Sequence, residues 1–169
     1  MRNIIEILVE EHENITQKIN EIEQSCIRFM EDNEIDIKKF RDYVKFIREY
    51  ADGTHHKKEE DILFREMLAR LGRVAENLVK NGMLVEHDLA RLYVMELSNA
   101  LDRYEEKHEV IDKLCIIGNA MSYVYLLRRH IDKENGVVYP YAEKNFDAEL
   151  MEELSKEAVK FDENIDITK

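Results

Sequence analysis

A twofold internal repeat constrains the fold of this chain more than any other feature of its sequence. Six histidines and glutamates form three pairs, and the two members of each pair lie 75 residues apart. The pairs are His12 with His87, His55 with His130, and Glu59 with Glu134. Each half therefore carries one histidine followed by a His-x-x-x-Glu motif, and a pattern that recurs at one offset predicts a duplicated structural unit.

That unit is predicted to be a pair of helices. The chain has only five glycines and one proline among 169 residues, so it has few residues that break helices. Apolar residues on either side of His12 follow alternating steps of three and four, which is typical of the core-facing side of a bundle helix. The same spacing returns around His87. We expect helices over about residues 3–31, 36–70, 76–107 and 109–144.

Short polar connectors between these segments favour antiparallel neighbours, so the predicted fold is all-α, an up-down-up-down four-helix bundle. The stretch from Phe146 onward predicts a short fifth helix on the outside, followed by a loose end at residues 165–169. We accordingly expect a bundle over residues 1–145 and a C-terminal helix and tail over residues 146–169.

The repeated residues are of the types that bind transition metals. Histidine nitrogen and carboxylate oxygen suit iron, manganese or zinc, and residues four apart project from the same face of a helix. Burying bare carboxylates in an apolar core would be very costly without a cation. We expect two metals, each held by two histidine nitrogens and by one oxygen from each bridging glutamate. The predicted ligands are His12, His55, Glu59, His87, His130 and Glu134.

The second helix offers an alternative register, because His56 and Glu60 are also four residues apart. The repeat disfavours that pair, since the residues 75 further along are Ile131 and Asn135. We therefore expect His56 at the surface, with a place beside the ligands as the alternative. A single histidine in an apolar stripe is more often a satisfied core residue than a ligand, so the metal site rests on the joint recurrence of all six residues.

The other polar residues are expected at the surface or in the core, without a role at the metal site. Surface positions are expected for His108, Lys57, Lys58 and Lys133, which lie in charged runs. Three tyrosines come near the second histidine of a half: Tyr50, Tyr123 and Tyr125. A phenol beside a metal could donate a hydrogen bond, carry an electron or bind the metal, but core packing with one hydrogen bond is the favoured interpretation.

Gly53 and Gly136 lie close to the ligand pairs, and each is expected to mark a close approach or a local irregularity of its helix. Pro140 is expected to weaken the end of the fourth helix. Cys26 and Cys115 stand alone, without the CxxC spacing of a redox or metal motif. Both are expected to be buried helix residues, and a disulfide between them is the weaker alternative.

The composition excludes several functions. A net charge of −12 argues against nucleic acid as a partner, because phosphate binding needs a basic surface. The sequence has no uninterrupted apolar run of about 18 residues, so no membrane span is expected. The first residues, MRNIIEILVEEHEN, turn acidic too early for a signal peptide, and we expect a cytoplasmic, mostly monomeric protein.

Four segments together resemble the hemerythrin-like (HHE cation-binding) family: EEHENI, ADGTHHKKEEDILF, VEHDLARLYV and LLRRHIDKENGVVYP. The resemblance extends from residue 1 to about residue 145. It implies a four-helix bundle around a non-haem di-iron centre with an oxygen bridge, and its ligands fall on the same six residues. Oxygen carriers of the family have a histidine where this chain has Arg91 and an aspartate where it has Asn135. The chain thus resembles the branch with four histidines and two glutamates.

The resemblance implies a di-iron protein that binds or reduces a small oxidant: dioxygen, peroxide or nitric oxide. Sensing, storage and detoxification are all compatible with such a site, and catalytic turnover would need an electron donor that the sequence does not identify. Manganese or zinc would suit the same ligands. The alternative function is a metal-stabilised helical interaction module without redox turnover.

Overall fold

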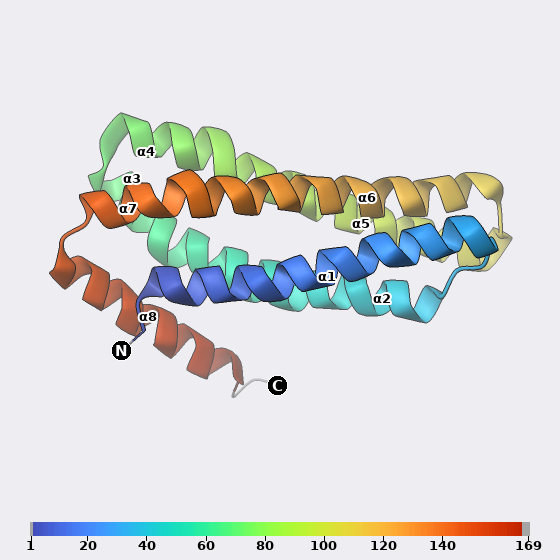
Figure 1. Ribbon diagram of the computed structural model, residues 1–169, viewed down its shortest axis with the longest axis horizontal. Helices are drawn as coiled ribbons and strands as arrows, with labels where there is room; N and C mark the ends of the chain where they lie inside the picture. The colour runs from blue at the N-terminus through green and yellow to red at the C-terminus, as the bar shows by residue number, and fades with distance from the viewer. Residues whose placement is uncertain (1, 167–169) are drawn as a thin grey trace.

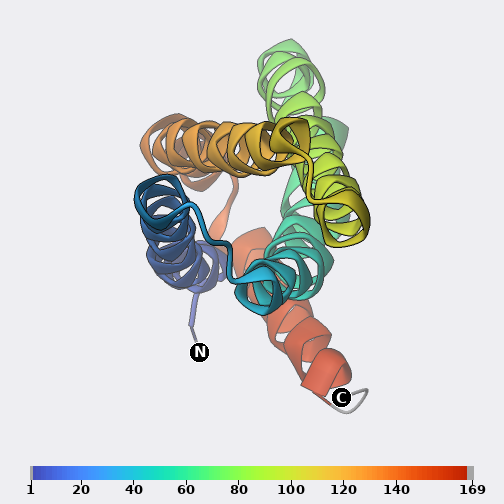
Figure 2. The ribbon, with the colours of Figure 1, turned by 90° about the vertical axis from the view of Figure 1, so that its right-hand side faces the viewer.

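The computed structural model describes residues 2–166, which form helices joined by short connectors (Figure 1). Four long helical runs lie antiparallel to their neighbours in the chain, and the end-on view shows them enclosing one bundle (Figure 2). The expected all-α, up-down-up-down bundle is confirmed.

Each run begins and ends close to its predicted bounds. The first run is α1 (Ile4–Asp32). The second contains α2 (Ile37–Phe46), the π-helical stretches η1 (Ile47–His56) and η2 (Glu59–Phe64), and α3 (Arg65–Arg70). The third contains α4 (Gly72–Leu78), the π-helical η3 (Val79–Met83) and α5 (Leu84–Lys107). The fourth contains α6 (Val110–Lys133), the π-helical η4 (Glu134–Val138) and α7 (Tyr139–Asn145). A fifth helix, α8 (Ala148–Asp166), follows.

Local signals in the sequence set several of these ends. At the start of α1, Asn3 accepts a hydrogen bond from the backbone of Ile5, and Glu6 accepts one from the backbone of Asn3. α1 and α5 are followed by Asn33 and His108 in left-handed backbone conformations (φ 56° and 55°), which end a helix. Gly72, at φ 64°, separates the second run from the third, so the third helix begins earlier than predicted.

The apolar core has two parts. One cluster extends from Ile15 toward the α1–α2 connector and includes Leu97, Ile116 and Leu127. The other lies at the opposite end, where Ile4 and Leu8 of α1 pack with residues of η2, η3, α7 and α8. The repeated histidines and glutamates fall between the two clusters along the chain, so apolar layers seal the polar layer on both sides.

Helix α8 covers the end of the bundle near the N-terminus, as both views show (Figures 1 and 2). Leu154 and Ala158 are buried in the second core cluster, and the Ser155 hydroxyl accepts a hydrogen bond from the backbone of Ile4 at 3.0 Å. The fifth helix is therefore confirmed, and it lies two residues later than the stretch 146–164 that predicted it. The division of the chain at residue 145 stays a prediction, and the end of the expected tail, residues 167–169, lies outside the described residues.

Three of the four π-helical stretches in the described part of the chain contain repeated residues, and η3 contains none. η2 begins at Glu59 and η4 begins at Glu134, so these two stretches obey the 75-residue offset. η1 has no such counterpart, because the equivalent residues 122–131 are α-helical in α6. A π-helix closes its turns over one more residue than an α-helix and often marks a functional site. The second run is thus π-helical at its two adjacent histidines, His55 and His56, although only His55 was predicted to face the core.

One helical run among the described residues, Val110–Asn145, has the length and composition to cross a membrane. This run is not an uninterrupted apolar stretch, so the expectation that the chain has no membrane span stays a prediction. The signal is weak, because core helices of soluble bundles give it as well. This run packs against α1 and α5 and contributes His130 and Glu134 to the interior, so the bundle accounts for part of its apolar character.

The glycines near the ligand pairs differ in what surrounds them. A Cβ added at Gly53 in η1 would lie 2.8 Å from the backbone oxygen of Arg48, five residues earlier, whereas one added at Gly136 in η4 would meet nothing within 4 Å. The close approach expected at Gly53 is confirmed, and it follows from the wide turns of η1. At Pro140 the helical run continues to Asn145, although η4 directly precedes the proline.

We predict that Gly53→Ala destabilises the protein by about 1–3 kcal/mol, because the backbone of η1 must shift to accept the methyl group. Gly136→Ala is the matched control and should be neutral or stabilising by up to about 1 kcal/mol, as is usual for glycine in a helix. Urea unfolding of the two variants measures both effects. Equal stability of the two variants would contradict the assignment of close contact to Gly53.

Candidate metal centre

The six residues of the repeat meet in the middle of the bundle. Each long run contributes: α1 supplies His12, η1 and η2 supply His55 and Glu59, α5 supplies His87, and α6 and η4 supply His130 and Glu134. All six side chains are at most 2% exposed. The structure therefore brings together every residue that the repeat singled out, although residues from the two halves are far apart in sequence.

Each glutamate lies between histidines of the two halves. Glu59 Oε2 is 3.6 Å from His55 Nε2 and 3.4 Å from His87 Nε2. Glu134 Oε2 is 3.1 Å from His12 Nε2 and 3.2 Å from His130 Nε2. Carboxylates placed in this way can bridge two cations, as the sequence analysis expected.

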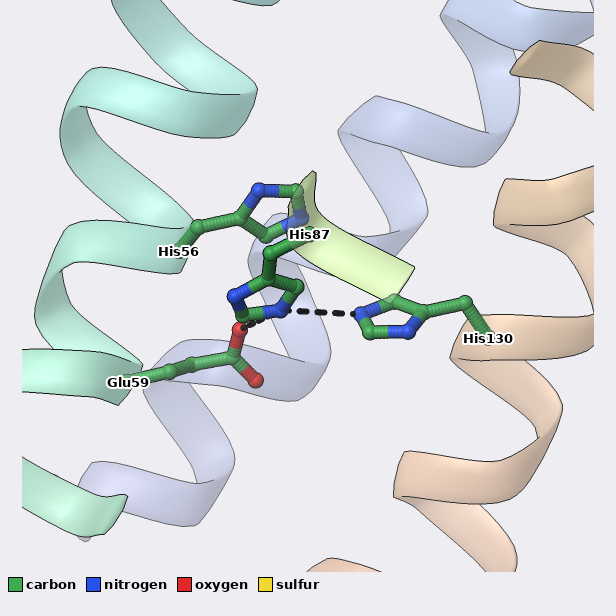
Figure 3. Close-up of side chains that lie close together, drawn as sticks. All are labelled: His56, Glu59, His87 and His130. Carbon is green, nitrogen blue, oxygen red and sulfur yellow. Dashed lines mark hydrogen bonds and ion pairs between the residues drawn. The ribbon is translucent and has the colours of Figure 1, made fainter. Parts of the chain in front are cut away.

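Two groups of ligand atoms satisfy the geometry of a metal site. Within each group, the ligand atoms all lie within 4.8 Å of one another. One group is His12, His55, Glu59 and Glu134, and the other is His56, Glu59, His87 and His130. Figure 3 shows the second group converging from three helical runs. Glu59 belongs to both groups, which is the arrangement that two neighbouring cations would need.

His56 is not at the surface, so the preferred expectation for it was wrong. Its side chain is only 2% exposed, and its ring stacks on His87 with the ring centroids 3.9 Å apart. His55 and His56 both face the interior, as the equivalent neighbours His130 and Ile131 do in α6. Glu60, the other member of the rejected register, lies 2.7 Å from His87 Nδ1. His56 and Glu60, which the symmetry argument set aside, thus both lie beside the six residues of the repeat.

The ring nitrogens that face away from the centre have polar partners, and these partners repeat as well. His55 and His130 each place Nδ1 2.9 Å from a glutamate, Glu11 and Glu86 respectively. Those glutamates are 75 residues apart. Likewise, His87 pairs with Glu60 and His12 pairs with Asn135 at 2.8 Å, again at the same offset. Such partners hold the proton on Nδ1 and turn the Nε2 lone pair toward the centre.

A buried lysine extends this pattern. Lys58 was expected at the surface, yet it is fully buried, with Nζ 2.5 Å from Glu11 Oε1 and 2.6 Å from Asp162 Oδ1 of α8. Its counterpart Lys133, 75 residues later, pairs with Glu86 and is half exposed. The correction has a simple cause, since α8 lies outside the repeat and covers only one of the two lysines. His108 is exposed, as expected.

A tyrosine that the sequence analysis missed reaches the centre. The Tyr139 hydroxyl donates to Glu59 Oε1 at 2.5 Å and lies 3.3 Å from His12 Nε2, and its ring stacks on His12. Phe64, 75 residues earlier, stacks on His87. An aromatic pair at the repeat offset was the signal that could have identified this position.

The tyrosines that were considered from the sequence lie elsewhere. Tyr50 is half-buried and accepts one hydrogen bond, from Asn14 at 2.8 Å. Tyr123 is buried in the core as expected, but its hydroxyl has no hydrogen-bond partner among the described residues. Tyr125 is 51% exposed, so core packing was wrong for it. Cys26 is buried, Cys115 is half-buried, and both thiols are free.

The buried carboxylates of the centre need positive charge nearby. Burial by itself would raise the pKa of Glu134, but the neighbouring rings of His130 and His12 hold that pKa well below its usual range. Burial would lower the pKa of His130, but the charge and hydrogen bonding of Glu134 raise it to about 10. Without a cation, protons on the histidines compensate the carboxylates. Burial, and repulsion from His87, lower the pKa of His56 well below its usual range, so its ring is neutral at pH 7.

Several buried atoms of the centre have no hydrogen-bond partner within the described part of the chain. They are Nε2 of His55, Nε2 of His56, Oε2 of Glu59 and both carboxylate oxygens of Glu134. A buried polar atom without a partner is costly. All of these atoms are metal-ligand types, and their residues belong to the two groups of ligand atoms described above, so the donor set fits metal cations.

A family model described as the hemerythrin HHE cation binding domain matches residues 3–142. That range includes all four long helical runs up to the middle of α7 and every residue of the centre. No curated relative matches the chain.

We predict that Glu86→Gln weakens metal binding by about 10- to 100-fold, because it removes the carboxylate that orients His130. The matched control is Glu76→Gln, which changes an exposed glutamate paired only with Lys80. Competition with a chelator of known affinity measures the effect. Equal affinities in the two variants would show that the outer hydrogen bond to His130 does not matter for the metal.

We also predict a pH dependence for the stability of the metal-free protein. The pKa of His130 is about 10 when folded and about 6.5 when unfolded, so its contribution is complete below about pH 6.5 and is lost as the pH rises toward 10. The free energy of unfolding should therefore fall between about pH 7 and pH 9, and His130→Gln should flatten that fall. Urea unfolding at several pH values tests this, and a stability that rises over the same window would refute it.

Proposed function

The chain belongs to the hemerythrin HHE cation-binding domain family, and we propose that its centre holds two iron ions that bind or reduce a small oxidant. Dioxygen, peroxide and nitric oxide are the candidate oxidants. The observation that carries the proposal is the pair of fully buried glutamates, each placed between histidines of both halves. We propose His12, His55, Glu59, His87, His130 and Glu134 as metal ligands.

When bound, a pair of irons supplies one-electron redox capacity and coordination positions for an external oxygen or nitrogen ligand. Manganese or zinc would also suit nitrogen and oxygen ligands. Iron is favoured because histidine and carboxylate ligands together, in an apolar bundle, resemble the di-iron centres of the family. The physiological metal is thus part of the proposal.

The residues of the chain prepare the site in three ways. The two apolar clusters keep bulk water away from the polar layer. Glu11, Glu60 and Glu86 fix the orientation of the imidazoles. Tyr139 keeps its proton, because burial and the nearby carboxylates hold its pKa well above the usual range. Its hydroxyl therefore places a hydrogen-bond donor beside Glu59 and His12.

A small cavity supports the choice of a small ligand. It has a volume of about 180 Å³ and is lined mainly by apolar side chains such as Ile47, Val94 and Met95, with His56 and Tyr123 also on its wall. A cavity of about 150 Å³ can hold a benzene-sized molecule, so a diatomic molecule or peroxide would enter easily. Because His56 belongs to both the cavity wall and the centre, we propose that this cavity is the route of entry.

A second candidate function is a metal-stabilised interaction module without redox turnover. The observation that favours it is an exposed apolar stripe on α5, formed at helical spacing by Val85, Leu89, Leu92 and Met95, each between 37% and 48% exposed. Exposed apolar residues in a continuous row often mark contact surfaces. In this function the metals would only brace the bundle.

One experiment distinguishes the two. Protein loaded anaerobically with ferrous iron is exposed to air, peroxide or nitric oxide, and its absorption is followed; zinc-loaded protein is the matched control, since zinc has no redox chemistry. We expect a spectral change with iron that zinc does not give. Repeated turnover with an added reductant supports a reductase, and a single reversible change supports a sensor or carrier. An iron-loaded protein that is inert toward all three oxidants would refute the oxidant-binding function and favour the module.

A further inference from the structure

We propose that His56 is a fifth histidine ligand, which makes the two metal positions chemically different. The inference rests on the proposed metal pair but goes beyond the six residues of the repeat. It assigns three histidine nitrogens to the position defined by His56, His87 and His130, and two to the position defined by His12 and His55.

The outer contacts of His56 follow the pattern of the other four buried histidines. In each of those, Nδ1 lies within 2.7–2.9 Å of a side-chain oxygen, while Nε2 faces the centre. His56 places Nδ1 3.4 Å from Asp52 Oδ1, and Arg91 holds that same oxygen at 2.8 Å. This leaves Nε2 of His56 on the inner side without a partner, as it does for His55.

The inner nitrogen of His56 is placed for coordination. His56 Nε2 is buried and has no hydrogen-bond partner within residues 2–166. A ligand atom of His56 lies within 4.8 Å of ligand atoms of Glu59, His87 and His130 (Figure 3). Metal–nitrogen bonds are about 2.0–2.1 Å long, so two ligands on opposite sides of one ion are about 4 Å apart. An ion lies in the plane of each imidazole that binds it, and the His56 ring is stacked on that of His87 with an interplanar angle of 13°. Binding would therefore need a rotation of the His56 ring as well as a small shortening of these separations.

Packing alone does not explain a histidine at this position. The equivalent residue in the second half is Ile131, which is 7% exposed and belongs to the apolar core. An isoleucine thus fills the same place in the duplicated unit without any polar partner. An imidazole that is buried without a partner for one nitrogen costs free energy, and it lies in the π-helical η1, whereas Ile131 lies in a regular α-helix. Both features are accounted for if the imidazole binds a cation.

The two metal positions then differ in the residues that surround them. The position with His56 gains a nitrogen ligand, whereas the position with His12 has the Tyr139 hydroxyl beside it, opposite the unreactive ring of Phe64 next to His87. The additional nitrogen leaves fewer coordination places for an external ligand on the His56 side. An external ligand that enters past His56 would therefore bind at the more open position on the His12 side, beside the Tyr139 hydroxyl.

Nitrogen-15 NMR of the zinc-loaded, full-length protein tests the inference directly, because zinc is diamagnetic and shifts the resonance of a bound Nε2. The chain has six histidines, of which exposed His108 serves as the internal unbound reference. We expect five histidines with a metal-bound Nε2. Four bound histidines, with His56 unshifted, would overturn the inference and leave the metal pair intact, whereas a protein that takes up no zinc or only one equivalent would overturn the metal pair itself.

The matched variants are His56→Ile, which introduces the residue of the second half, and His108→Ile at the surface. We expect His56→Ile to lower the affinity for one of two ferrous ions by at least about tenfold, with the other unchanged, and His108→Ile to change neither. His56→Gln provides a second variant if isoleucine disturbs the helix, and circular dichroism checks the fold of each. In Mössbauer spectra of iron-57, the wild type should show two unlike ferrous sites. Full affinity for both ions and an unchanged spectrum in folded His56 variants would refute the role of His56.

Discussion

The burial of two carboxylates in the middle of an apolar bundle is the constraint on which the rest of the structure depends. Glu59 and Glu134 have no exposed surface, and an apolar cluster lies on each side of them. A charge in such a place is tolerated only with a partner. The surrounding imidazoles provide that partner as protonated groups in the metal-free protein, and as neutral ligands once cations replace the protons. Lysines and outer glutamates then balance the next layer, so charge compensation extends from the centre to the surface.

The sequence predicted the fold and the main part of the centre because both depend on periodicity. Steps of three and four gave the four long helices, and the offset of 75 gave six side chains that do meet. The errors arose where periodicity carries no information. His56 was expected at the surface because the offset pairs it with Ile131, but the offset says nothing about burial, and both residues are buried. Lys58 is buried because Asp162 reaches it from α8, which lies outside the repeat. Tyr139 was missed because it matches an aromatic residue, Phe64, and not another tyrosine.

The two halves of the bundle share a scaffold but differ around the centre. The outer glutamates Glu11 and Glu86 occupy equivalent positions in the two halves. In contrast, the position equivalent to His56 holds Ile131, and the position equivalent to Tyr139 holds Phe64. These two differences lie beside different histidines of the centre, since His56 stacks on His87 and Tyr139 stacks on His12. A duplicated hairpin would by itself give two equal positions. One residue difference beside each metal position would make the two positions unequal, while the helices keep their common packing.

The contacts of Lys58 connect the last helix with the polar layer. Asp162 of α8 pairs with Lys58, Lys58 pairs with Glu11, and Glu11 holds the outer nitrogen of His55. Every link in this series is an ionic or charge-assisted contact, and the lysine in its middle is fully buried. If α8 detached, Lys58 would be uncovered and Glu11 would become its only acidic partner in the series, which would weaken the hold on the His55 ring. The docking of a terminal helix that lies outside the repeat is therefore linked to the orientation of an imidazole in the middle of the molecule.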